Sequence, residues 1–159
     1  MKNKLFTFAV LLPLFAVVFS ACKDKGNDEP NYPVKISFDN YSLEDSSCQW
    51  TNLPFNDKVI IINSKEELEK YISCTENSYP EVDFEKYTLV LAHGLATSNV
   101  LKINSSLQQI SKQVYEMKVE VLVGYALVMT YWYVPIIVNK LRDGCIVELI
   151  ASYYPPDFD

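Results

Sequence analysis

The sequence predicts an α+β fold, mainly an antiparallel β-sheet shaped as a small sandwich or half-barrel, with one helix at about residues 65–73. Three observations predict this class. Six or seven segments alternate apolar with polar residues or consist of β-branched runs, as strands do. One segment has helical spacing behind a start signal. The links between the later strands are of hairpin length, and such links join antiparallel neighbours.

The composition limits the classes of function. The chain has 159 residues, of which 49% are hydrophobic, so it fits one domain with a buried core rather than a disordered chain. It carries 14 Lys+Arg against 20 Asp+Glu, a net charge of −6, and Arg142 is its one arginine. Nucleic acid is not expected as a partner, because binding it through bulk charge needs clustered basic residues.

The N-terminus has the layout of a secretory signal. Lys2 and Lys4 precede an apolar run over 5–19, which two small residues and Cys22 follow. The run of about 15 residues is shorter than the roughly 20 that a membrane-spanning helix needs. We therefore expect a signal peptide over residues 1–21.

The segment 19–22 resembles a bacterial lipobox, which implies that Cys22 becomes the N-terminus and carries acyl chains that hold the protein on a membrane. Residues 22–33 predict a flexible acidic tether, since 23–30 has no apolar side chain except proline. The tether is similar to the surface-export signals of Bacteroidota lipoproteins. These resemblances imply an outer-membrane lipoprotein of the cell envelope, periplasmic or surface-exposed. The alternative is an ordinary signal peptide followed by a free cysteine.

A single globular domain is predicted over residues 34–159. It begins with a short edge strand at 34–38, where apolar and polar residues alternate. Residues 39–57 are rich in Asn, Asp and Ser, which predicts an irregular lead-in. A β-branched run at 59–62 predicts a buried strand. The lead-in is expected to pack on the body through Cys48, Trp50, Leu53 and Phe55.

The helix has a recognisable start. Ser64 can accept a hydrogen bond from the Glu67 N–H while the Glu67 side chain reaches back, which is a capping box. Leu68, Tyr71 and Ile72 then recur at helical spacing, with acidic residues near the positive end of the helix dipole.

The later segments predict the remaining strands. Residues 114–123 alternate over their whole length, which predicts a half-buried strand. Pro135 predicts a bulge or a sheet edge near the end of its strand. Arg142-Asp143-Gly144 predicts a hairpin turn before the last strand. The other strands are expected at 87–92, ended by His93-Gly94, at 100–103, ended by a polar turn at 104–106, at 125–138 and at 145–153.

Residues 62–141 resemble the C-terminal domain of PrcB-like protease-complex accessory proteins, and many Bacteroidota lipoproteins of similar length. The resemblance is carried by the segments 63–68, 82–87, 89–92, 94–103 and 133–138. It implies an envelope protease, or the complex that contains one, as the class of partner. It supplies no catalytic residue. Ser98-Asn99 stand where that family usually has a Gly-Gly pair, so the family's partner-binding loop is not carried over.

The cysteine spacing favours one disulfide. No C-x-x-C pair is present, which disfavours zinc and thioredoxin-type redox chemistry. With Cys22 lipidated, three cysteines remain in an oxidising compartment. A Cys48–Cys74 bond would close a loop of about 27 residues and pin the lead-in. Cys145 is then a small buried apolar residue. Three free thiols, or a pair that uses Cys145, are the alternatives.

His93 is the single histidine and the obvious general base. Ser98 or Ser105 could serve as its nucleophile, but no G-x-S-x-G elbow is present. A histidine at a strand end beside glycine is more often a turn or edge residue. The acidic residues form no twelve-residue calcium loop. We expect neither a metal site nor a cofactor.

Aromatic residues are the remaining signal for binding. Tyr131, Trp132 and Tyr133 are consecutive, so Trp132 points to the face of a strand opposite the two tyrosines. Aromatic side chains that remain exposed suit a protein partner or sugar stacking. The alternative is that both faces of this strand are buried.

The sequence therefore predicts a lipid-anchored, non-enzymatic binding module of the cell envelope that engages a protein partner through a sheet edge or an aromatic patch. A protease-associated accessory or inhibitor-like subunit is the class that the resemblance implies. One alternative is a carbohydrate-binding lipoprotein that stacks sugars on Trp50, Tyr131, Trp132 and Tyr133. The other alternative is a small hydrolase built on His93.

Overall fold

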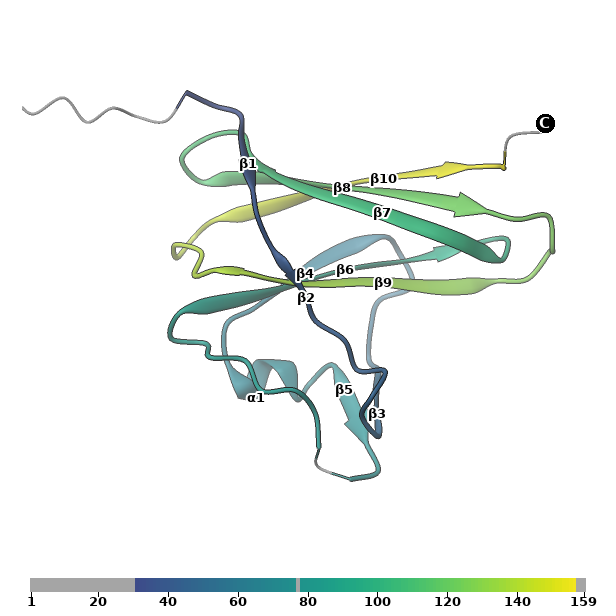
Figure 1. Ribbon diagram of the computed structural model, residues 1–159, viewed down its shortest axis with the longest axis horizontal. Coiled ribbons are helices and arrows are strands. Elements are labelled where there is room, and N and C mark those ends of the chain that lie inside the picture. The colour runs from purple at the N-terminus through teal and green to yellow at the C-terminus, as the bar shows by residue number, and fades with distance from the viewer. Residues whose placement is uncertain (1–30, 77, 157–159) are drawn as a thin grey trace, which may run out of the picture.

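Ten strands and one short helix form three layers in the computed structural model, which describes residues 31–76 and 78–156 (Figure 1). The upper sheet has the order β1-β7-β8-β10, and the middle sheet has the order β2-β9-β6-β4. The third layer lies below the middle sheet and contains the two-stranded ribbon β3-β5 and the helix α1. The signal peptide and the lipidation of Cys22 concern residues that lie outside the described range.

Each layer consists of elements that come from several parts of the chain. The upper sheet consists of β1 (Val34–Ile36), β7 (Val100–Gln109), β8 (Val114–Val123) and β10 (Ile146–Tyr154). The middle sheet consists of β2 (Asp39–Asn40), β9 (Thr130–Asn139), β6 (Tyr87–Ala96) and β4 (Lys58–Ile62). The third layer consists of β3 (Cys48–Trp50), α1 (Lys65–Leu68) and β5 (Ile72–Cys74).

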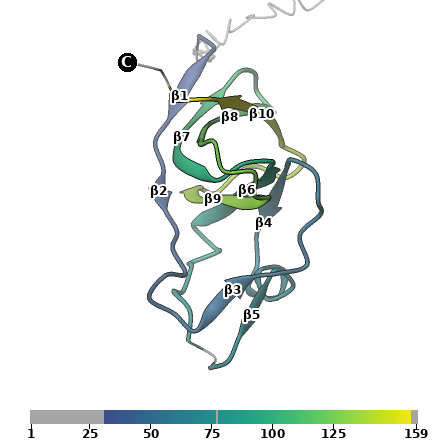
Figure 2. The same cartoon turned by 90° about the vertical axis from the view of Figure 1, so that its right-hand side faces the viewer.

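The middle sheet is shared by two hydrophobic cores, because its two faces pack against different layers (Figure 2). Alternation along β6 sends Val90 and Ala92 toward the upper sheet and Leu89 and Leu91 toward the third layer. This explains why residues 88–94 are buried without interruption. The upper core also holds Met117, Val119, Val121, Trp132 and Ile136, and the lower core holds Tyr41, Leu43, Ile62, Leu68 and Ile72.

The predicted fold class is confirmed: the strands form mostly antiparallel sheets that do not close, with one short helix. The strand at 114–123 begins and ends where the alternation predicts. The lead-in is less irregular than expected, since it contains β2 and β3. Cys48 and Trp50 pack as predicted, but Phe55 is 78% exposed.

The helix is shorter than the predicted 65–73 and spans only Lys65–Leu68. Its start is as expected: the Glu67 N–H donates to Ser64 Oγ at 3.2 Å, and the Asn63 N–H donates to the Glu67 carboxylate at 2.7 Å. The helix stops because Ile72 is recruited into β5, where it pairs with Trp50 and fills the lower core. Tertiary pairing has overridden the helical spacing.

Two strand boundaries are also different from the prediction. β6 continues through His93 and Gly94 to Ala96, since β9 pairs with it over its full length. No turn occurs at 104–106, because β7 runs on to Gln109. The polar residues Asn104 and Ser106 lie on the outer face of the upper sheet, opposite Glu120 and Lys118. Their polarity indicates solvent on that face and not a turn.

The prediction that Arg142–Gly144 joins two paired strands as a hairpin is wrong. A turn forms there, with Gly144 at φ 76°, but it carries the chain from β9 in the middle sheet to β10 in the upper sheet. β10 therefore pairs with β8 in parallel, from Ile146 opposite Val114 to Tyr154 opposite Leu122. Residues 124–129 make the matching crossing from β8 to β9, so β9 begins later than the predicted residue 125.

Pro135 lies where a proline is tolerated. The Tyr41 N–H donates to Pro135 O at 3.0 Å, so the backbone polar groups of Pro135 face β2 rather than β6. β2 pairs with β9 only at Ile136 and Ile137, so the missing N–H interrupts no ladder. Neither the bulge nor the edge strand of the prediction occurs, since β9 lies between β2 and β6 and its register with β6 is unbroken; Pro135 instead directs its polar groups to the side where β2 pairs only briefly.

Candidate functional site

The free edge of β10 is the most distinctive surface of the described chain. The Ile146 N–H donates to Gln113 O at 2.9 Å, which shows which residues of β10 direct their backbone groups toward β8 in the parallel ladder. Every second residue from Ile146 onward therefore bonds to β8, and the intervening residues direct their N–H and C=O groups away from the sheet. These outward-directed residues are Val147, Leu149, Ala151 and Tyr153. None of their backbone groups pairs with a strand in the described range.

This edge lacks the protection that natural sheets usually give to theirs. Edge strands are normally kept short, charged with lysine, or interrupted by proline or a bulge. β10 has nine residues, its register with β8 is unbroken, and Glu148 is its one charged residue. The described edge strands at the other sheet borders are shorter: β1 has three residues, β2 has two and β4 has five. Because β1 reaches only residues 107–109 of β7, the stretch 100–106 is open as well, but it carries Lys102 and a register irregularity.

An apolar stripe runs along the outer face of the same strand. Ile146, Ile150 and Tyr154 are 56%, 43% and 50% exposed. Their neighbours on β8 across the ladder include Lys118, which pairs with Glu116 at 3.2 Å. A strand added beside β10 would place its own side chains next to this stripe.

A hydrogen-bonded chain joins the two sheets beside the end of β10. The Trp132 indole N–H donates to Tyr153 Oη at 2.9 Å, and the Tyr153 hydroxyl donates to the Asp57 carboxylate at 2.8 Å. Partial burial and the bond to Asp57 raise the pKa of Tyr153 to about 12. Gly94 makes room for this arrangement, because a Cβ there would meet Asp57 and come within 2.5 Å of the Trp132 ring.

Trp132 is therefore a core residue, and the prediction that it offers a stacking surface is wrong. It is 2% exposed, because the inward face of β9 packs between the sheets. Tyr131 and Tyr133 lie on the opposite face, as the alternation predicts, and Tyr131 is 46% exposed.

The structure brings Trp50 and Tyr133 together in one groove of about 530 Å³. Tyr41 lies there as well, with its ring centroid 6.1 Å from that of Trp50. Burial raises the pKa of Tyr41 to about 12, and its hydroxyl donates to Pro80 O at 2.9 Å. Polar side chains at the rim are those of Ser42, Glu44, Ser46 and Gln49. Tyr131 is not part of the lining.

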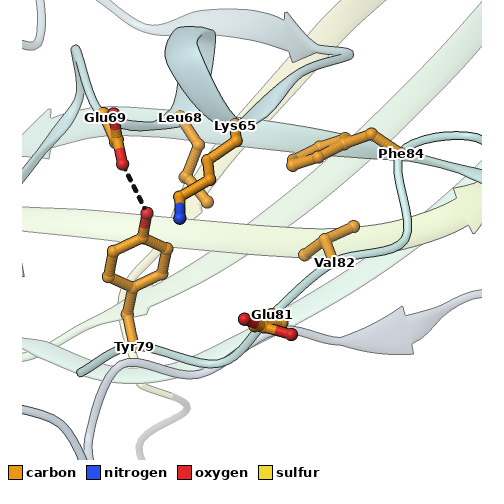
Figure 3. A pocket seen from close by; sticks show the side chains of 7 residues that line it. All are labelled: Lys65, Leu68, Glu69, Tyr79, Glu81, Val82 and Phe84. Atoms are coloured by element: carbon orange, nitrogen blue, oxygen red, sulfur yellow. Dashed lines mark hydrogen bonds between the residues drawn. The ribbon is translucent and has the colours of Figure 1, made fainter. Parts of the chain in front are cut away.

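A second hollow, of about 360 Å³, lies between α1 and residues 79–84 (Figure 3). The Tyr79 hydroxyl donates to Glu69 at 2.8 Å, and Lys65 Nζ lies 6.0 Å from the centre of the Tyr79 ring. Burial, the bond to Glu69 and the surrounding carboxylates raise the pKa of Tyr79 to about 12. The bond between Tyr79 and Glu69 thus links the loop to the end of the helix beside this hollow.

His93 is buried in the strand that was expected to end there. It is 1% exposed, points with Leu91 toward the third layer, and stands between Lys58 and Tyr133 in the register. Its Nε2 has no hydrogen-bond partner in the described chain, so no pairing with Ser98 or Ser105 occurs through this atom. Burial lowers the pKa of His93 below its ordinary 6.5, so the folded protein holds the neutral imidazole.

Acidification is expected to destabilise the fold through His93. The lowered pKa means that only the unfolded chain takes up a proton as the pH falls from 6.5 toward the folded value, so this stability is present above 6.5 and lost below it. The free energy of unfolding should fall by up to about 1.4 kcal/mol per pH unit in that window. Urea titrations between about pH 7 and pH 5 measure it. The variant His93→Phe should lose this slope, and an identical slope would assign it to other groups.

The predicted disulfide is confirmed. Cys48 and Cys74 are bonded and stand opposite each other in the ribbon β3-β5, with 4.0 Å between their Cα atoms. Cys145 is free and half-buried, and packs against the upper core. No group of His, Cys, Asp and Glu residues in the described ranges could hold a metal ion. The described part of the chain contains no helix that is long and apolar enough to cross a membrane.

No family model, curated protein or solved structure matches this chain. The resemblance to PrcB-like accessory proteins therefore stays a prediction from the residues.

The free edge of β10 was not among the predicted site residues. The turn signal at 142–144 indicates a hairpin, which would have paired the last strand with the one before it. The apolar stripe at Ile146, Ile150 and Tyr154 was visible in the sequence, but it could not be told from an inward face without the pairing partner.

Proposed function

We propose that this protein is a lipid-anchored, non-enzymatic binding module of the cell envelope that engages a protein partner by adding an extended segment of it to β10. The observation that supports this function is the nine-residue edge with unpaired backbone groups at every second residue. An extended segment satisfies such groups with its own N–H and C=O groups, whatever its side chains are. The anchor is the acylated Cys22, and an envelope protease or its complex is the proposed class of partner.

The side chains beside the edge would provide selectivity. Ile146, Ile150 and Tyr154 favour apolar residues at alternate positions of the added strand, since cross-strand neighbours on one face contact each other. Glu148 lies between Ile146 and Ile150 on the same face and disfavours an acidic residue opposite it. We therefore expect the bound segment to be extended, to alternate apolar residues, and to lack acidic residues on that face.

Blocking one amide of the edge tests the function. Ala151→Pro replaces the outward-directed N–H with the proline Cδ, while the ladder with β8 uses none of the polar groups of Ala151. Ala151→Ser is the matched control, since it changes the side chain and keeps the amide. In the parent chain and in both variants, a photo-crosslinking residue replaces Ile150, and the proteins are illuminated in native envelopes. We expect a discrete protein adduct with the parent chain and with Ala151→Ser, and its loss with Ala151→Pro.

The result that contradicts strand addition is an adduct that survives Ala151→Pro in a variant with the parent's thermal unfolding. The absence of a protein adduct, together with retention on a glycan array, would instead support carbohydrate binding. The groove that holds Trp50, Tyr41 and Tyr133 favours this second function, because it combines aromatic faces with polar side chains at the rim.

A further inference from the structure

The crossing from β8 to β9 presents an apolar tip to solvent. Leu127 is 95% exposed, Met129 67% and Val128 50%. Tyr125 and Tyr131 flank them and are 60% and 46% exposed. Contiguous apolar side chains at such exposure are uncommon on a soluble surface unless they meet an apolar phase or a partner.

The structure holds this tip in place. The Asn99 N–H donates to Ala126 O at 3.2 Å, the Ala126 N–H donates to Asn99 Oδ1 at 3.1 Å, and the Gly124 N–H donates to Asn99 O at 2.7 Å. The Val128 N–H also donates to Ala126 O, at 2.9 Å. The turn between β6 and β7 thus braces the tip in a conformation in which several of its backbone groups are already satisfied. That lowers the cost of taking the tip out of water.

The segment of sequence that contains the tip has no charged residue. No Asp, Glu, Lys or Arg occurs between Glu120 and Lys140. Aliphatic side chains at the point and tyrosines at the base match the order of a membrane interface, where tyrosine prefers the headgroup level and leucine or valine the hydrocarbon. In space, exposed Lys102 on β7 lies opposite Leu122, so a charged side chain stands beside the base of the crossing and none within it.

From these features we infer that residues 125–131 insert into the lipid bilayer that carries the protein's own anchor. The inference rests on the proposed function, which supplies that anchor at Cys22. Val34 pairs with Gln109, so the chain enters the domain at the end opposite the tip (Figure 1). The twelve residues from Cys22 to Val34 reach at most about 40 Å. Ten-residue strands are about 33 Å long, so the tether permits the tip to fold back onto the same membrane.

Depth-dependent fluorescence tests the insertion. The full-length chain, produced in a bacterium with a cell envelope and purified from its membranes, is reconstituted into phosphatidylcholine vesicles with brominated acyl chains. Leu127→Trp places an indole at the tip. Asp143→Trp places one at the exposed turn before β10, which lies at the opposite end because Ile146 pairs with Val114 at the start of β8. The parent chain gives the background fluorescence of Trp50 and Trp132, which is subtracted from that of each variant. We expect blue-shifted, bromine-quenched emission for Leu127→Trp alone, unchanged by added salt, because the tip carries no charge.

Flotation of the vesicles separates the ways in which this can fail. If the chains float and the Leu127→Trp indole is quenched no more than the Asp143→Trp indole, the tip lies outside the bilayer, insertion is overturned and the anchor stands. This is also the result expected if the tip binds a protein partner in the cell instead of lipid. If no chain floats, the anchor of the proposed function fails and the insertion fails with it. Both variants must keep the parent's thermal unfolding midpoint, as substitutions at exposed positions usually do.

Discussion

Replacing Trp132 with alanine is expected to lower the free energy of unfolding by about 3–5 kcal/mol. The side chain is 2% exposed and fills the space between the two sheets. Its ring meets Tyr153 edge-on at 6.5 Å between centroids, and its indole N–H donates to the Tyr153 hydroxyl. Alanine leaves a cavity and removes the donor of that bond, and Gly94 opposite has no side chain that could fill the space.

Chemical denaturation followed by far-UV circular dichroism measures this loss. Tyr131→Ala is the matched control, because it removes an exposed aromatic ring from the neighbouring position of the same strand, on the side opposite to Trp132. Its effect should stay within about 1 kcal/mol. Equal losses for the two variants would mean that both rings are equally buried, contrary to their positions in the structure.

Removing the disulfide with Cys48→Ser and Cys74→Ser is expected to cost about 3 kcal/mol, since the bond closes a loop between residues 26 positions apart. The loss should be concentrated in the third layer. β3 and β5 have three residues each and pair only with each other, whereas the sandwich above has longer ladders.

Amide hydrogen exchange shows where the effect falls. We expect faster exchange in β3 and β5 and in the capped helix α1, with β8 and β9 retaining their protection. Cys145→Ser is the control, because that thiol is free. A variant whose β8 amides lose as much protection as those of β5 would show that the three layers unfold as one unit.

The sequence predicted local structure well wherever one face of an element meets water. The alternation at 114–123 and the Ser64–Glu67 capping box are examples, because each depends on residues close in sequence. The cysteine spacing favoured the Cys48–Cys74 disulfide but left a pair with Cys145 and three free thiols open, since the partners are 26 positions apart. Sheet membership was not predictable, since Arg142-Asp143-Gly144 reads alike whether the next strand pairs with β9 or leaves for another sheet.

The candidate site was only partly predictable for the same reason. Alternation placed Trp132 opposite Tyr131 and Tyr133 but could not say which face is the core. The grouping of Trp50 with Tyr133 depends on the ribbon folding back across the middle sheet, and the free edge of β10 depends on the parallel pairing. Both are long-range contacts that no local pattern encodes.

The parallel pairing also determines when the fold can be completed. Ile146 meets Val114, 32 residues earlier in the chain, and all of β9 must cross to the other sheet in between. When the chain is synthesised from its N-terminus, β7 and β8 can pair as soon as both are present. The other edge of β8 stays unpaired until β10 has been made. Contacts this distant in sequence slow folding. The surface proposed for a partner therefore forms only with the last step, and a chain truncated before β10 would have no means of binding through it.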